Sequence, residues 1–323
     1  MNLASPLWDE LSPEQKDVYT KRAKELRGLD ENNPSGGPMD SHGRSLKDIK
    51  KRDEEERLLD QKKIQDVDDF ISREAANLED VSFFVIHTNI FFKSEMGKDA
   101  IFVPAEICLS RFSLRAGLTG VYQSFPAPDP PGSPIPAGEK RACMQQSDKI
   151  QIPLQFEDPA GSTTEDLVVL REIRSFLAGT EMVFTMPDCE EQCSGVLDRI
   201  AQRSGQPGLG LRFLSLSRLL FNLKTVRCQT EEEAVANCPS ERIALRELER
   251  ERFLYWPGLS CVWHEEHTET ALCSQATVAR WIFTILDNCC PLYNIALLPG
   301  RHAPQKLPPI KTEIWSGLSG ARR

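Results

Sequence analysis

Two cysteines and a histidine near the C-terminus are spaced as metal ligands are. Cys261, His264 and Cys273 follow the pattern C-x2-H-x8-C, and thiolate and imidazole are ligands that tetrahedral zinc prefers. A tight turn would point the first pair at one ion. The third ligand lies in an apolar run, residues 271–290, that is predicted to be a helix. Three ligands leave a fourth position for a residue elsewhere in the chain or for water.

From spacing alone, a purely structural role for these three residues is as well supported as metal binding. Free cysteine is often buried as a small apolar residue, and one C-x2-H pair with a further cysteine is less specific than two C-x2-C pairs. His267 is a substitute candidate for His264. Other cysteines have no histidine at ligand spacing and are interpreted as free thiols or core residues: Cys189, Cys193, Cys228, Cys238, Cys289 and Cys290.

The composition is that of a folded chain without a membrane partner. The sequence has 323 residues, 40% hydrophobic and 27% charged, and this length predicts about two domains. No apolar run approaches the roughly 18 residues of a spanning helix. The N-terminus is acidic where a secretory signal is basic, so we expect an intracellular protein whose ten cysteines are thiols or metal ligands. The net charge of −9 disfavours nucleic-acid binding unless positive charge is segregated.

The first 79 residues separate into three segments by composition. Residues 1–28 contain a helix whose predicted start is Ser12-Pro13, an N-cap followed by a first-turn proline. Residues 29–44 are rich in Asn, Pro, Gly and Ser and form a predicted linker. Residues 45–79 mix both charge signs at helical spacing and are predicted to form a charged, solvated helix.

The segment W-x2-L-S-P-E-x-K-x2-Y-x3-A, which begins at Trp8, resembles the second half of an HMG box. Three helices in that family bind the minor groove of DNA and bend it. The basic first segment and first helix of the box do not precede it here, and residues 1–28 carry five basic and five acidic side chains. The resemblance implies a partial HMG box with a weak DNA contact.

From residue 81 the pattern becomes that of an α/β domain. Short stretches rich in β-branched and aromatic residues predict strands, and helical spacing of apolar residues predicts helices. The predicted strands are 81–93 and 100–112, paired as a hairpin, with 150–156 and 182–185. The predicted helices are 166–177, 193–203 and 241–253, while 211–223 fits either. Residues 125–139 contain six prolines and are predicted to be a loop.

Residues from about 81 to 300 resemble the Maelstrom domain. The resemblance rests on VPAEICLSRFSLRAG at residues 103–117, on the C-x2-H-x8-C pattern and on the apolar helix after it. A preceding HMG box is the usual domain order of that family. The resemblance implies an RNase H-like α/β fold with a mixed sheet, related to DnaQ-type exonucleases, over residues 80–298. It also implies a structural zinc held by Glu106, Cys261, His264 and Cys273.

The same resemblance implies a function in the germline small-RNA pathway. Family members are expected to bind single-stranded RNA, to act with proteins of the PIWI-interacting RNA (piRNA) pathway in transposon silencing, and to reside in perinuclear cytoplasmic granules and the nucleus. Exonucleases of this fold hold two metal ions with several carboxylates, but the strand at 81–92 contains no acid. We therefore name no catalytic residue. Alternatives are a metal-independent single-stranded RNA endonuclease, with His87 as a candidate base, and an HMG-box DNA-binding or chromatin protein.

Cationic side chains in the second half of the chain are candidates for RNA contact. Glutamates are interleaved with several of them, so a salt-bridged helix face is the favoured alternative. Residues 299–323 carry five basic side chains, one acid and four prolines, and predict a flexible tail that assists RNA binding through charge. The candidates are Lys224, Arg227, Arg242, Arg246 and Arg250.

Overall fold

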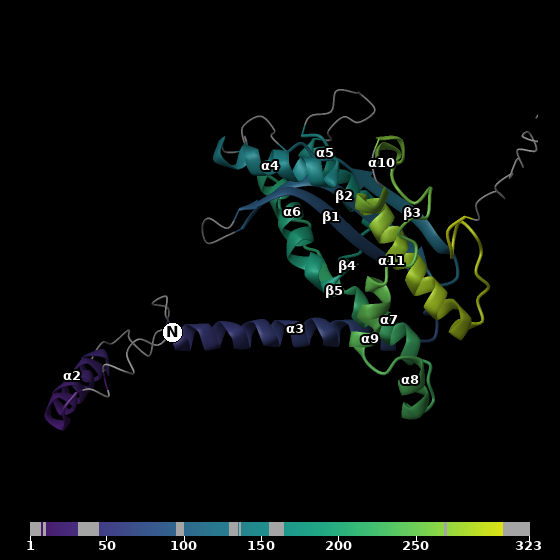
Figure 1. The fold of residues 1–323 in the computed structure, drawn as a ribbon. Helices are drawn as coiled ribbons and strands as arrows, with labels where there is room; N and C mark the ends of the chain where they lie inside the picture. The colour runs from purple at the N-terminus through teal and green to yellow at the C-terminus, as the bar shows by residue number, and fades with distance from the viewer. Residues whose placement is uncertain are drawn as a thin grey trace, which may run out of the picture. The chain divides into compact units, whose positions relative to one another are not determined.

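A computed structural model describes most of the chain and divides it into two units, Met1–Lys62 and Lys63–Arg323 (Figure 1). The described residues are 8, 11–31, 45–94, 100–128, 135, 137–154, 165–267 and 270–305. No helix among them is both long enough and apolar enough to cross a membrane.

The first unit contains helix α2 (Pro13–Glu31). Its start is a capping box, because the Gln15 N–H donates to Ser12 Oγ at 3.3 Å and the Ser12 N–H donates to Gln15 Oε1 at 3.0 Å. The predicted helix start is thereby confirmed, while the partial HMG box stays a prediction. Most of the predicted linker, residues 29–44, lies outside the described residues.

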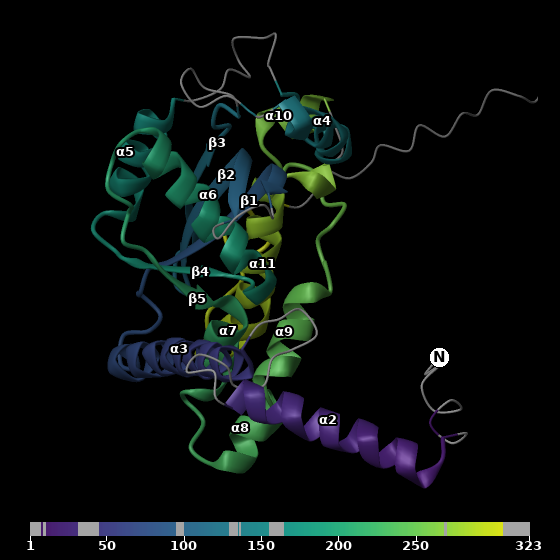
Figure 2. The ribbon, with the colours of Figure 1, turned by 90° about the vertical axis from the view of Figure 1, so that its left-hand side faces the viewer.

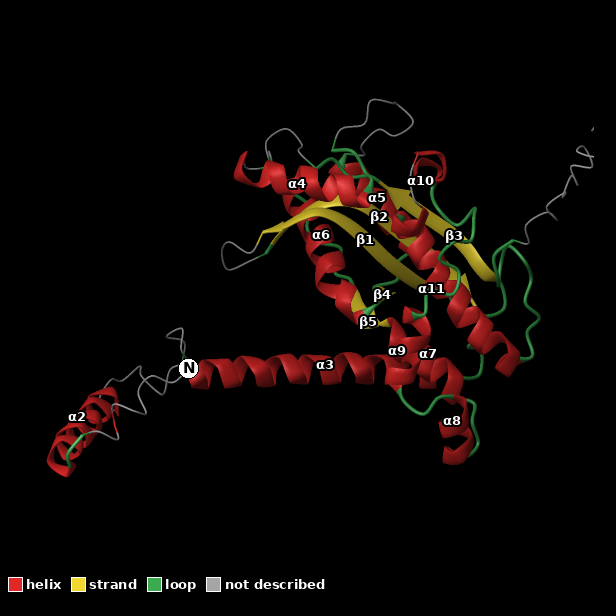
Figure 3. Ribbon diagram, viewed as in Figure 1, coloured by secondary structure: helices red, strands yellow, loops and turns green. Residues whose placement is uncertain are grey.

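Five described strands form one mixed sheet in the order β3-β2-β1-β4-β5 (Figure 3). Strands β1 (Phe83–Ser94), β2 (Ile101–Ser113) and β3 (Gly117–Ser124) are successively antiparallel. Strands β4 (Met182–Thr185) and β5 (Arg212–Ser215) follow beside β1 and run parallel to it. Thus β2 alone runs against the other four, an arrangement consistent with the expected RNase H-like fold.

Helices cover both faces of this sheet (Figure 2). Successive side chains of a strand point to opposite faces, and on β1 this alternation puts Phe84 and Ile86 in a core cluster with α5 (Asp166–Leu177) and α6 (Glu190–Arg203). Phe83 and Val85 belong to a second cluster on the face covered by α11 (Ser274–Cys289). The other described helices of this unit are α4 (Ala137–Ile150), α7 (Leu216–Thr225), α8 (Glu231–Asn237), α9 (Glu241–Glu249) and α10 (Val262–His267).

The charged helix predicted at 45–79 is α3 (Leu46–Glu74), and its second half belongs to the domain. Val67 and Ile71 are buried in the core. The Arg218 guanidinium donates to both carboxylate oxygens of Asp68, at 2.7 and 2.6 Å. The second compact unit therefore begins at Lys63, before the boundary at residue 80 that composition indicates.

Several element predictions are confirmed and others are corrected. The helix at 166–177 and the strand at 182–185 have the predicted bounds, and 211–223 resolves into β5 followed by α7. The third strand is β3 and not 150–156, because Ile150 ends α4 and the following residues through 154 form no strand. Two glycines and few apolar residues left β3 without a β-rich pattern.

Helix ends also differ from the sequence pattern. Helix α4 begins at Ala137, inside the segment predicted to be a loop. Helix α9 ends at Glu249, four residues before the predicted end, because Glu251 takes a left-handed backbone conformation with φ 47°. Helix α11 begins at Ser274 and ends at Cys289, within the predicted 271–290.

The beginning of the predicted flexible tail is packed on the domain. The Leu118 N–H donates to the Arg301 carbonyl at 2.8 Å. His302 is 1% exposed, and its Nε2 lies 3.0 Å from the Leu114 carbonyl oxygen. The tail prediction is thus wrong for residues 299–305, and residues 306–323 lie outside the described part.

Substitution at Gly117 tests this docking. Gly117 has φ +71°, and an added Cβ would lie 2.4 Å from the Arg301 carbonyl oxygen. Gly117→Ala should therefore combine left-handed strain of about 1–2 kcal/mol with displacement of segment 299–305. Gly210→Ala is the matched control, because φ there is +65° and an added Cβ would meet nothing within 4 Å. Urea unfolding should show the larger loss for Gly117→Ala; equal losses would contradict the docked segment.

Candidate metal centre

Glu106 is brought to the α11 face of the sheet by strand register. It pairs with Asn89 across β1 and β2, and the next pair is Ile90 with Pro104. Ala105 is therefore an extra residue in β2, a bulge that re-aims the neighbouring side chain. Pro104 has no N–H to donate to the ladder, which suits an irregular position. The result is a carboxylate that is 0% exposed.

The other three ligand candidates lie at the ends of two helices. Cys261 immediately precedes α10, and its carbonyl accepts from the Glu265 N–H at 3.0 Å. His264 follows three residues later, so both side chains share one face of the helical turn. Cys273 is the N-cap residue of α11. All three residues are buried.

These four side chains converge, as the resemblance implies. Their ligand atoms all lie within 4.8 Å of one another. His264 Nδ1 lies 3.1 Å from Cys261 Sγ and 3.8 Å from Glu106 Oε1, while Cys273 Sγ lies 3.4 Å from Glu106 Oε1. Tetrahedral zinc with bonds of about 2.0–2.3 Å needs ligand separations of roughly 3.3–3.8 Å. The donor set and its spacing therefore fit a metal ion, and no other such group occurs among the described residues.

Surrounding donors hold the ligands in place. Glu106 Oε2 accepts from Asn89 Nδ2 at 2.9 Å and from the Ser274 N–H at 2.8 Å, at the beginning of α11. The Cys261 N–H donates to Cys273 Sγ at 3.3 Å. Such partners orient metal ligands and are as much part of a metal site as the ligands. They also leave Glu106 Oε1 directed at the other three ligands.

The electrostatics of the cluster favour a positive charge at its centre. Burial opposes the charged imidazole, but Cys273 and Glu106 outweigh it and raise the pKa of His264 above its ordinary value. Burial raises the pKa of the Cys273 thiol far above its ordinary value. The negative charge of a buried carboxylate among thiols must be balanced by a positive charge. A metal cation that replaces the protons of the thiols and the imidazole provides that charge.

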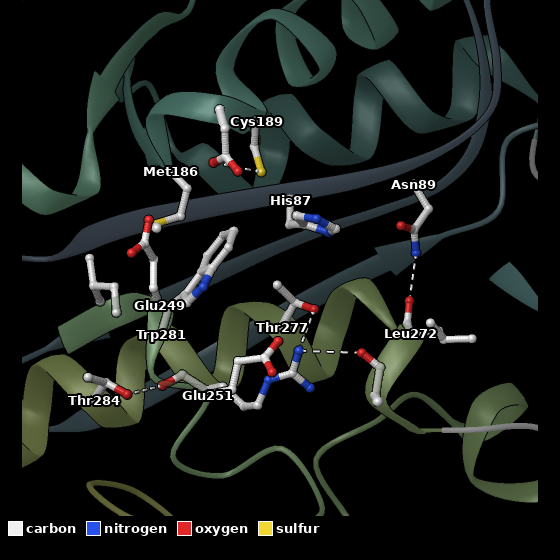
Figure 4. A pocket seen from close by; sticks show the side chains of 14 residues that line it. His87, Asn89, Met186, Cys189, Glu249, Glu251, Leu272, Thr277, Trp281 and Thr284 are labelled. Carbon is white, nitrogen blue, oxygen red and sulfur yellow. Dashed lines mark hydrogen bonds between the residues drawn. The ribbon is translucent and has the colours of Figure 1, made fainter. Parts of the chain in front are cut away.

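A pocket adjoins the metal centre on the same face of the sheet (Figure 4). Strand alternation puts His87 on the same face as Asn89, and both line the pocket. Asn89 Nδ2 also donates to the Leu272 carbonyl at 2.8 Å. Burial, with a smaller contribution from the Arg280 charge, lowers the pKa of His87 to about 4. His87 is therefore neutral at pH 7, with Nδ1 3.0 Å from Ser274 Oγ.

The structure does not bring the RNA-contact candidates into the metal centre. Lys224 Nζ donates to Asn288 Oδ1 at 3.3 Å, and Arg227 is paired with Glu79 at 3.0 Å and lies over the Tyr293 ring. Arg250 is paired with Glu247 at 2.7 Å, as the salt-bridged alternative predicts. The remaining candidates, Arg242 and Arg246, are exposed on α9, and Arg250 is exposed directly after it.

The cysteines outside the metal centre are thiols, and one pocket residue was not among the predicted site residues. All ten cysteines are free, and Cys193 Sγ accepts from Thr88 Oγ1 at 3.7 Å. Sequence reasoning missed the pocket residue Arg280. The available signal was its position in an apolar helix, where it is one of two charged residues in 271–290.

Comparison with known proteins points to one family. The Maelstrom family, described as a piRNA pathway germ-plasm component, matches residues 96–308. A protein maelstrom homolog of Culex quinquefasciatus is 24% identical over 320 residues, 94% of this chain and 59% of that protein. Protein maelstrom 1 of Drosophila ananassae is 25% identical over 94% of this chain and 73% of its own length. Protein maelstrom of Drosophila melanogaster is 24% identical over 94% and 65%. The chain thus spans between 59% and 73% of these relatives.

Metal content tests the ligand set. Cys261→Ser should abolish stoichiometric metal, measured by plasma mass spectrometry on the purified full chain, because serine replaces one of two thiolates. Cys289→Ser is the matched control, since Cys289 is equally buried but lies at the other end of α11. It should retain about one ion per chain. Equal metal content in the two variants, or none in a folded wild type, would refute the site.

The pH dependence of stability tests the environment of His87. Its pKa is about 4 in the folded chain and near 6.5 when exposed. As the pH falls, the unfolded chain therefore binds a proton at this histidine before the folded chain does. The contribution of neutral His87 to the free energy of unfolding is complete above pH 6.5 and is lost as the pH falls toward 4. Removing the titration with His87→Gln should flatten that part of the profile. Melting temperatures across pH 4–7 should show the wild type falling more steeply than the variant. Any acid loss from the metal centre is common to both, and parallel profiles would contradict the assignment.

Proposed function

This chain belongs to the Maelstrom family, and from that premise we propose that it is a germline factor of the piRNA pathway that silences transposons and binds single-stranded RNA. The observation that carries the proposal is the family match over residues 96–308, within which the buried Glu106-Cys261-His264-Cys273 set is assembled. The proposed partners are single-stranded RNA and other proteins of the pathway. The proposed location is the perinuclear germ granules and the nucleus.

The proposed ion at this set is one structural zinc per chain. Two thiolates and an imidazole favour zinc over magnesium or calcium, which prefer oxygen ligands. Four protein ligands leave no open position for substrate or water, and this closure is typical of a structural site. When bound, the ion would contribute folding free energy. Glu106, Cys261 and Cys273 would then join β2 to the beginnings of α10 and α11.

The proposed RNA surface is the exposed side of α9. Arg242 and Arg246 are exposed one turn apart on α9, and Arg250 is exposed at its C-cap, so the three form one stripe at four-residue spacing. Three cations at helical spacing can contact successive phosphates of a flexible RNA strand. This contact needs local positive charge and not a positive net charge of the whole protein. Lys224 and Arg227 lie at and just after the end of α7, outside this stripe, and are bound to residues of other segments, so they play a smaller part. The weak DNA contact of the partial HMG box is a separate proposal that rests on the resemblance alone.

Metal-independent cleavage of single-stranded RNA is a second candidate. The observation that favours it is a neutral His87 in a pocket that also contains Asp188 and Arg280. A neutral imidazole can accept a proton from an attacking hydroxyl, although a pKa of about 4 makes it a weak base. Binding without cleavage therefore remains the main proposal.

Salt-dependent binding to single-stranded RNA tests the proposal. Replacing Arg242, Arg246 and Arg250 together with glutamine should reduce the slope of log affinity against log salt by about two units, since each single-strand phosphate contact contributes about 0.7. Fluorescence anisotropy over a salt series measures the slope. The control is the double substitution Lys50→Gln with Lys51→Gln. These cations lie on the charged helix α3, so their replacement should change the salt slope little.

Two further results decide between the candidates. Deleting the gene in germ cells should raise transposon transcripts, and the wild-type chain should restore silencing where the triple variant does not. RNA that stays intact during binding without added divalent cations, with the metal content of the chain verified, favours the non-enzymatic role. Cleavage that disappears in His87→Gln, with metal content retained, would favour the nuclease. An unchanged salt slope together with full rescue would overturn the proposed RNA surface.

A further inference from the structure

The pocket beside the metal centre has the position of a ligand site. Its volume is about 370 Å³, within the range of small-molecule sites. It lies on the α11 side of β1 and includes Met186 and Asp188, which directly follow β4. In open α/β sheets ligands bind beyond the carboxyl ends of parallel strands. The zinc ligands do not line it, so it is a second site.

One buried donor in this pocket has no partner within the described residues. Arg280 lines the pocket and is only 6% exposed. Its Nη2 donates to Thr277 Oγ1 at 3.0 Å and to the Ala271 carbonyl at 3.4 Å (Figure 4). Its Nη1 is buried without a hydrogen-bond partner. Unsatisfied buried donors are rare because they lose hydration without compensation, so a ligand that brings acceptor atoms would complete the site.

The charges around Arg280 restrict what that ligand can be. Three exposed carboxylates, from Asp188, Glu249 and Glu251, also line the pocket. An anionic ligand would be repelled by these three negative charges. A guanidinium or ammonium group would bring no acceptor for Nη1. The pocket therefore suits a neutral group that accepts from Arg280 and donates to a carboxylate.

The remaining walls suit a flat aromatic ring. Trp281, Met186 and Leu248 are largely buried apolar residues that line the pocket. Aromatic side chains bind single-stranded nucleic acid by stacking on its bases. Glu251 at the mouth holds a left-handed backbone, φ 47°, directly beyond α9, and strain of this kind concentrates at ligand sites.

We propose that this pocket binds one unpaired guanine base of single-stranded RNA. Guanine presents its O6 acceptor to the unpartnered Arg280 Nη1. Its N1–H and amino group form a neighbouring donor edge that a carboxylate at the mouth accepts. Helix α9 contributes Glu249 to the pocket and Arg242 and Arg246 to its exposed side, and Arg250 follows directly after the helix. The base enters the pocket while those cations are available to the phosphates.

The inference rests on the proposed RNA binding, and the experiment separates the two. The full chain, with its metal content verified, is titrated by fluorescence anisotropy with uridine 12-mers that carry one central guanine, adenine, cytosine or uracil. The guanine oligonucleotide should bind at least about tenfold more tightly than the uracil one, as expected for a two-point base contact. Equal binding of all four would overturn the guanine pocket and leave RNA binding intact. No binding to any of them would overturn both.

Variants then locate the preference. Arg280→Lys keeps the positive charge but loses the planar guanidinium group. It should reduce the affinity for the guanine oligonucleotide to that for the uracil oligonucleotide. Glu251→Gln and Glu249→Gln, at exposed positions where glutamine keeps the size of the side chain, should also lower the guanine preference. Lys149→Gln is the control, because it removes one cation from a different pocket and should leave the guanine-to-uracil ratio unchanged.

Two outcomes identify other ligands. Guanosine monophosphate alone binding as tightly as the oligonucleotide would show that the site takes a free nucleotide, and the RNA assignment would fall. An arginine-rich peptide that displaces the guanine oligonucleotide but not the uracil one would show that the pocket takes a cationic side chain. A guanine preference retained in Arg280→Lys, with both glutamine variants also unchanged, would place base recognition elsewhere in the chain.

Discussion

A carboxylate buried on β2 constrains the rest of this domain. Glu106 is 0% exposed, and an ionised carboxylate without water is stable only with hydrogen bonds and opposite charge. Asn89 on β1 and the Ser274 N–H of α11 satisfy one of its oxygens. The other oxygen faces His264 and Cys273. The register of β1 with β2 and the position of α11 are thus tied to one group.

The metal centre and the neighbouring pocket share this framework. Asn89 donates both to Glu106 and to the carbonyl of Leu272, a pocket residue. Ser274 connects them a second time, because its N–H reaches Glu106 and its hydroxyl lies 3.0 Å from His87. Rigid ligands that are held by surrounding hydrogen bonds also fix the pocket walls built on the same elements. In this family member, the buried Glu106-Cys261-His264-Cys273 set organises the face of the sheet on which nucleic acid is proposed to bind.

The chain has a five-stranded mixed sheet consistent with an RNase H-like domain, while β1 carries no acid among residues 81–92. Where carboxylates would be needed to hold two metal ions, the pocket has a neutral histidine and a buried arginine. Its carboxylates lie at exposed positions and do not converge into a metal-binding group among the described residues. The same fold therefore presents a surface with different chemistry, as expected when function depends on side chains and not on topology.

The sequence by itself determined the elements with strong local signals and the residue types of the metal set. The helix start at Ser12-Pro13, helix 166–177 and strand 182–185 depend on neighbouring residues, so their patterns were sufficient. Cys261, His264 and Cys273 have ligand spacing, but Glu106 lies 155 positions before the first of them (261 − 106) and entered only through the family resemblance.

Tertiary structure decided what depends on contacts between distant segments. Strand β3 has no β-rich pattern and forms because β2 offers a free edge; segment 299–305 is ordered by hydrogen bonds to Leu118 and Leu114. The unpartnered nitrogen of Arg280 is likewise invisible in the sequence, because hydrogen-bond satisfaction depends on every neighbour in space and not on residue type.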